Sequence, residues 1–139
     1  MGDAGELKSK ITLDATGFKK EMDLVKRKMQ ENVNEFKVAA SAAEAFGTAE
    51  DKLKAKQKYL TDQIAQQKEK VTLLWYAYLD SSDAKGIDAK ATQKLADQLA
   101  TAKAGLNKMQ GELNQTNQAL NKNEGEVNGT KLAWERLKG

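Results

Sequence analysis

The sequence predicts an all-α fold in which long helices form an antiparallel helical hairpin or coiled coil, preceded by a short extended segment. Three observations support this prediction. The 139 residues include no proline, so no residue type forbids long helices. Apolar residues recur at alternating spacings of three and four, which is the heptad pattern. Charged residues make up 31% of the chain and mean hydropathy is −0.72, a composition typical of solvated helices.

A single heptad register extends through most of the chain. If Phe18 is assigned position d, each later d position lies a multiple of seven residues further on. The register is kept across Gly47 and across the polar stretch Asp80–Asp88, which independent helices would not require. The predicted a and d residues, called the seam below, are Phe18, Met22, Val25, Met29, Asn32, Phe36, Ala39, Ala43, Phe46, Leu53, Gln57, Leu60, Ile64, Gln67, Val71, Leu74, Tyr78, Leu95, Leu99, Ala102, Leu106, Met109, Leu113, Thr116, Leu120 and Asn123.

The first elements follow from local signals. Ile11 and Leu13 alternate with polar neighbours, so residues 1–16 are expected to be an extended or flexible lead-in. A first helix is expected over residues 17–46. Thr48 is followed three residues later by Asp51, which resembles a capping box and predicts a second helix over 48–80.

The second half of the chain is divided by the loop-forming residues of Asp80–Asp88. A third helix is expected over 88–122, and a frayed helical tail over 123–139, where glycines recur. The second and third helices are each about 50 Å long at 1.5 Å per residue, so they can pair antiparallel along their length. A continuous rod of roughly 180 Å is the alternative; the helix-breaking residues of the loop favour the hairpin.

Three aromatic residues lie close together just before this loop. The register places Tyr78 on the seam, Trp75 beside it and Tyr76 on the outside of the helix. A binding platform would need its rings on one face. We therefore expect Trp75 and Tyr78 to pack at the closed end of the hairpin, with their polar atoms reaching water.

Several seam positions carry polar side chains. Such residues can fix helix register and partner number at a cost in stability. They could equally be exposed positions in a loosely packed bundle, and the sequence leaves both interpretations open. These residues are Asn32, Gln57, Gln67, Thr116 and Asn123.

The sequence lacks the residue types that most catalytic and metal sites use. It has no histidine and no cysteine, and its Ser, Thr and Lys residues show no suggestive spacing. An EF-hand alignment on Gly86 fails, because it places Lys85 at a ligand position and Thr92 where a glutamate is needed. We predict a protein that is not an enzyme, with no catalytic, cofactor-binding or metal residues, no cofactor and no small-molecule substrate.

The charge pattern argues against nucleic acid and membrane partners. The 23 basic and 20 acidic residues alternate closely, so the net charge of +3 is not gathered on one face. The densest basic run wraps around the helix: Lys52, Lys54, Lys56 and Lys58. The apolar run Val71–Leu79 is far shorter than the ~20 residues of a membrane span. Nucleic acid binding is therefore unlikely, and this segment is predicted to make no membrane contact.

Residues 11–22, ITLDATGFKKEM, lead from an extended stretch into a helix and resemble the start of tail tape measure proteins of long-tailed phages and prophages. The similarity continues through LKAKQKYLTDQIAQQKEKV (53–71), KLADQL (94–99) and LNKMQGELNQT (106–116). It covers roughly residues 9–120. Members of that family are much longer, which implies that this chain is an N-terminal fragment.

The resemblance implies a structural function. A tape measure protein lies extended inside the growing tail tube and sets its length during virion assembly, so the implied partners are tail tube and tail assembly chaperone proteins. Self-association through the coiled-coil seam is also expected. The implied location is the virion tail interior, and the host bacterial cytoplasm during assembly. The alternative function is a generic coiled-coil adaptor or a secreted helical-hairpin protein; secreted hairpins of the Trp-x-Gly type differ, because Ala77 follows Trp75 and Tyr76 here.

Overall fold

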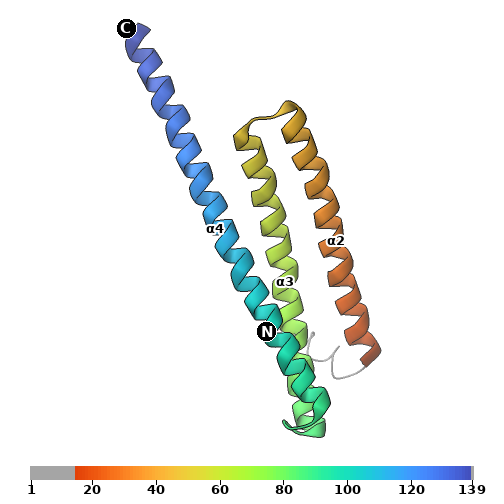
Figure 1. Ribbon diagram of the computed structural model, residues 1–139. Helices are drawn as coiled ribbons and strands as arrows, with labels where there is room; N and C mark the ends of the chain where they lie inside the picture. Colours follow the sequence, from red (N-terminus) through yellow and green to blue (C-terminus); the bar gives the residue numbers. More distant parts are fainter. Residues whose placement is uncertain (1–14, 139) are drawn as a thin grey trace, which may run out of the picture.

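The computed structural model describes the backbone of residues 15–138 and the side chains of residues 17–122. Within this range the chain forms the helices α2 (Ala15–Phe46), α3 (Ala49–Lys85) and α4 (Lys90–Lys138), and the described backbone contains no strand (Figure 1). The prediction of an all-α fold is confirmed. The lead-in predicted over residues 1–16 lies outside the described residues up to position 14, and Ala15 and Thr16 already belong to α2.

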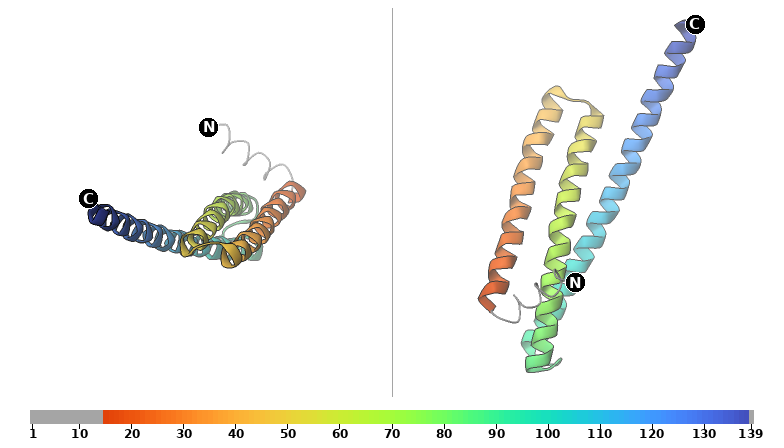
Figure 2. Two further views of the ribbon diagram at one scale, coloured as in Figure 1. Left: turned by 90° about the horizontal axis from the view of Figure 1, so that it is seen from above. Right: turned by 180° about the vertical axis from the view of Figure 1, so that it is seen from behind.

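The three helices form an open layer with α3 in the middle. α3 packs against α2 on one side and against α4 on the other. Among the described residues the backbones of α2 and α4 do not approach each other closely, although Phe18 and Met22 of α2 pack against the cluster formed by Leu74, Leu99 and Ala102. Successive helices run in opposite directions (Figures 1 and 2). Both figures show α4 continuing past the α2–α3 turn, so its last part extends beyond the other two helices.

The connection between α2 and α3 is as short as the capping signal suggested. The backbone N–H of Thr48 donates to Asp51 Oδ2 at 2.9 Å, and the Asp51 N–H donates to Thr48 Oγ1 at 3.2 Å. This reciprocal pair satisfies two amide groups that the first turn of a helix leaves without partners. The predicted capping box is therefore confirmed, and it fixes the start of α3 at Ala49.

The predicted loop Asp80–Asp88 was too long, because α3 continues to Lys85. The Ser81 hydroxyl shares a hydrogen bond of 2.7 Å with the hydroxyl of Thr92, whose side chain is fully buried. Ser81 therefore remains part of α3, because α4 supplies its hydrogen-bond partner. The chain breaks at Gly86, where φ is +92° and ψ is 157°. That backbone conformation is essentially restricted to glycine.

α4 also differs from its predicted boundaries. It begins at Lys90 and continues to Lys138 as one helix, whereas the prediction had a helix over 88–122 and a separate frayed tail over 123–139. Glycine within a helix costs only about 1 kcal/mol relative to alanine, so the glycines near its end do not suffice to break it.

Candidate interaction surfaces

α3 has two packing faces, and the sequence analysis found only one. The predicted seam faces α4, where Leu74 packs with Leu99 and Ala102 in a buried cluster. A second face, at positions c and g of the same register, meets α2, where Leu73 and Ala77 pack with Val25. Leu73 is completely buried. The central helix is therefore held on both sides, which a single seam cannot provide.

A signal for the second face is present in the sequence but weak. Its positions also repeat at alternating four- and three-residue spacings, so they form a second heptad stripe. The middle of that stripe is polar, so an analysis based on apolar residues alone does not detect it. The stripe consists of Tyr59, Gln63, Gln66, Lys70, Leu73 and Ala77.

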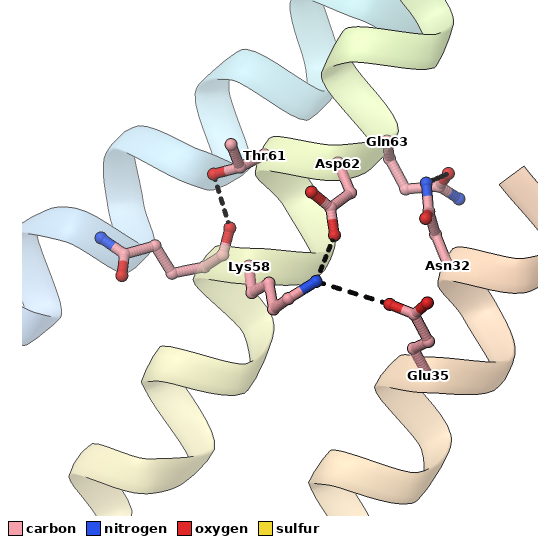
Figure 3. Close-up of polar contacts among 7 residues, drawn as sticks. Asn32, Glu35, Lys58, Thr61, Asp62 and Gln63 are labelled. Carbon is pink, nitrogen blue, oxygen red and sulfur yellow. Dashed lines mark hydrogen bonds and ion pairs between the residues drawn. The ribbon is translucent and has the colours of Figure 1, made fainter. Parts of the chain in front are cut away.

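Polar and aromatic side chains connect α2 and α3 along this second face. Asn32 Nδ2 donates to Gln63 Oε1 at 3.2 Å, and Gln63 Nε2 donates to the Tyr59 hydroxyl at 3.2 Å. The Tyr59 ring lies 4.7 Å from the ring of Phe36, measured between centroids. Gln63 is only 5% exposed, and its side chain points toward Asn32 in Figure 3. Hydrogen bonds that cross an interface in this way favour one alignment of the two helices.

An ion-pair group lies on the exposed edge of the same interface. Lys58 Nζ is 2.7 Å from Asp62 Oδ2 and 3.4 Å from Glu35 Oε2, so it joins α3 to α2 (Figure 3). The hydrogen bond to Asp62, more than its charge and more than Glu35, raises the pKa of Lys58 above its ordinary value. Because the group is exposed, water and salt screen it and its contribution to stability is small.

Polar side chains on the seam also connect α3 to α4. Gln67 Nε2 donates to the backbone oxygen of Ala102 at 2.8 Å, and Gln57 Nε2 donates to Asn117 Oδ1 at 2.7 Å. Gln67 is 5% exposed and Thr116 is 3% exposed. The interpretation of polar seam residues as exposed positions is therefore wrong for these two, while Asn32 and Gln57 are partly buried and Asn123 lies outside the described side chains.

The aromatic group near the end of α3 is arranged differently from the prediction. Trp75 is 43% exposed, its ring is stacked on Tyr78 with centroids 6.0 Å apart, and Lys103 Nζ lies 5.6 Å from its centroid. Tyr76, expected on the outside, instead packs against the cluster formed by Val25, Leu73 and Ala77. The reason is that the second face of α3 packs against α2, so Tyr76 at the adjoining position f also contacts this cluster.

The seam prediction also fails at the end of α2. Ala43 is the last buried residue of this helix, whereas Ala39 is exposed and Phe46 is 92% exposed. Val38 is 72% exposed nearby. The chain leaves α2 at Gly47 to reverse into α3, so Phe46 lies at the turn with no facing helix to cover it. An apolar surface is thus left open to solvent at this end of the layer.

A larger groove lies on the layer between the first turns of α2 and the first half of α4, above the middle of α3. Its volume is about 690 Å³. Apolar side chains from all three helices line it, and lysines on each helix surround them. We call it the α2–α4 groove; it is lined by Phe18, Lys19, Met22, Gln67, Lys70, Leu74, Lys94, Asp97, Gln98, Thr101, Ala102 and Gly105.

Among the described side chains, no three acidic, histidine or cysteine residues are gathered as a metal site would require. Within the described part of the chain, every helix is too polar over any stretch of membrane-spanning length to cross a bilayer. No family model, curated protein or solved structure matches this chain.

Proposed function

We propose that this chain is a structural module of a phage or prophage tail and forms part of the tape measure that sets tail length during assembly. The observation that supports the proposal most directly is the resemblance of residues 11–22 to the start of tape measure proteins. The shape agrees with it: α4 alone spans roughly 74 Å at 1.5 Å per residue, and the helices lie along one another (Figure 1).

In this proposal the helices pack as two consecutive antiparallel hairpins of coiled-coil type, α2 with α3 and α3 with α4, preceded by the extended N-terminal segment. The two heptad stripes of α3 support it, since each faces one neighbour. The hydrogen bonds from Asn32 to Gln63 and from Gln67 to Ala102 support it further, because each favours one register of a helix pair.

In this proposal the module acts only through protein–protein contacts. It has no catalytic role, and its partners are tail tube and tail assembly chaperone proteins together with further copies of itself. It would act in the virion tail interior, and in the host bacterial cytoplasm during assembly, as the N-terminal part of a longer chain. Exposed Phe46 and Val38 offer apolar surface for such contacts.

The decisive experiment shortens the module within the intact gene. Removing two heptads from α3 (57–70) and two heptads from the facing part of α4 (104–117) preserves the register of both helices. Tails shorter by roughly 20 Å are expected if the helices stay folded back, and by roughly 40 Å if they extend inside the tube. Electron microscopy of negatively stained virions measures the change.

A matched control keeps the length and changes the surface. Ser41→Ala and Lys37→Ala together alter exposed polar side chains of α2 without removing residues, and tail length should not change. Shortened genes that give tails of unchanged length would contradict the tape measure proposal. A coiled-coil adaptor or secreted helical hairpin would then be the better assignment, and the exposed apolar end of α2 is the observation that favours it.

A further inference from the structure

The α2–α4 groove is an open apolar surface bordered by charged side chains. Phe18, Met22, Leu74 and Ala102 supply its apolar lining. Phe18 and Met22 pack against the cluster that contains Leu74 and Ala102 but are only partly buried. An apolar groove of this size gains stability when apolar side chains fill it.

The charges on the rim of the groove disfavour a symmetric dimer in which two copies of the chain pack groove to groove. Lys19, Lys70 and Lys94 come from the three different helices, whereas Asp97 is the acidic residue among the lining side chains. Two copies joined symmetrically through this surface would bring like charges together, which is unfavourable. The rim instead favours a segment that carries carboxylates beside its apolar side chains.

The described chain begins at the edge of this groove. α2 starts at Ala15, and Phe18, which lines the groove, lies one turn later. Leu13 is two residues before Ala15, so its backbone is within roughly 7 Å of the start of α2 at about 3.3 Å per extended residue. The residues just before α2 therefore reach the groove without a long connection.

The sequence of those residues fits the groove chemically. Ile11 and Leu13 are apolar and alternate with polar residues, and Asp14 follows them in the sequence while Lys10 precedes them. Along α4 the groove extends from Lys94 to Gly105, or roughly 17 Å at 1.5 Å per residue. Five extended residues span about the same distance.

We propose that the α2–α4 groove binds the N-terminal segment of the same chain, with Ile11 and Leu13 as the apolar side chains that fill it. This contact would join the beginning of the chain to α4. Phe18 and Met22, in the first two turns of α2, already supply two of the groove walls. The inference does not depend on the tape measure proposal.

Disulfide trapping tests this proposal cleanly, because the chain contains no cysteine. The test variant carries Leu13→Cys with Thr101→Cys, since Thr101 is an exposed residue on the groove. The matched control carries Leu13→Cys with Ala104→Cys, since Ala104 is exposed one turn later on α4 but does not line the groove. Both are oxidised at low protein concentration, with and without denaturing urea, and analysed by non-reducing electrophoresis.

In the native protein we expect the Thr101 pair to form its intramolecular disulfide at least about tenfold faster than the Ala104 pair, because docking raises the effective concentration beyond that of a simple tether. In urea the two rates should become equal. Equal native rates would overturn the proposal. Disulfide-linked dimers in place of monomers would overturn it in favour of a second copy as the occupant.

A second measurement keeps the proposal testable if cysteines perturb the groove. The variant Ile11→Asp with Leu13→Asp changes only residues before α2. If the segment fills the groove, this variant binds more of the apolar dye anilinonaphthalene sulfonate and melts at a lower temperature, with unchanged helix content. Dye binding and melting temperature equal to those of the unchanged chain would refute it.

Discussion

The stability cost of truncating Leu73 distinguishes an α3 that packs on two faces from an α3 that packs only through the seam. Leu73 lies at heptad position c, outside the seam, yet it is fully buried against Val25 and Ala77. Leu73→Ala removes three carbons, which corresponds to about 2.4 kcal/mol of transfer free energy at ~0.8 kcal/mol per methylene. The remaining cavity adds to this cost, and helices in an open layer can partly close it. We expect a loss of roughly 2.5–3.5 kcal/mol in the free energy of unfolding.

The matched control is Leu24→Ala, because Leu24 also occupies position c but is 37% exposed on α2. Its cost should be about 1 kcal/mol or less. The free energies come from urea titrations followed by circular dichroism, with the slope of each transition checked for change. A double-mutant cycle with Val25→Ala should show coupling of at least about 0.5 kcal/mol. If Leu73→Ala costs no more than Leu24→Ala, α3 does not use the second face.

Three further predictions concern the glycines and Lys58. Gly111→Ala should stabilise the protein by about 0.5–1 kcal/mol in urea titrations, because a β-carbon there meets no atom within 4 Å. Gly105→Ala should stabilise it less, since its β-carbon would lie 3.0 Å from Gln67 Nε2. Equal stabilisation by the two variants would argue against the close approach of Gln67 to Gly105. Gly86→Ala should cost about 1–3 kcal/mol because of the positive φ, and an unchanged melting temperature would contradict that conformation. Lys58→Gln should barely move the urea midpoint at neutral pH. Because the pKa of Lys58 is raised, any stabilisation from its ion pairs is present below the ordinary value of 10.5 and is lost as pH rises through the folded pKa. A stability difference between Lys58→Gln and the unchanged chain that grows above pH 10.5 would be evidence against the ion pairs.

Helix content and the seam between α3 and α4 could be predicted because they depend on periodicity, which is local. Leu74, Leu99 and Ala102 are buried where the register placed them. Ser81 was assigned to a loop on its intrinsic preference, but its partner Thr92 is contributed by the facing helix. A single sequence does not reveal such a partner until the chain reversal is located.

The second face of α3 could not be predicted for a related reason. Gln63 is buried there because Asn32 and Tyr59 satisfy its amide, although its polarity alone indicates exposure. The prediction for Phe46 is wrong in the opposite direction: the residue is apolar and in register, but α2 ends there and its side chain is exposed. The α2–α4 groove depends on all three helices together, so no local pattern could have indicated it.

Small-angle X-ray scattering of the purified chain tests the central structural claim most directly, because it measures the longest dimension in solution. Helices folded against α3 leave α4 as the longest element, so a monomer should show a maximum dimension of roughly 75–85 Å at 1.5 Å of rise per residue. A monomer with a maximum dimension near ~180 Å would be a continuous rod and would contradict the packing of α2 and α4 on α3.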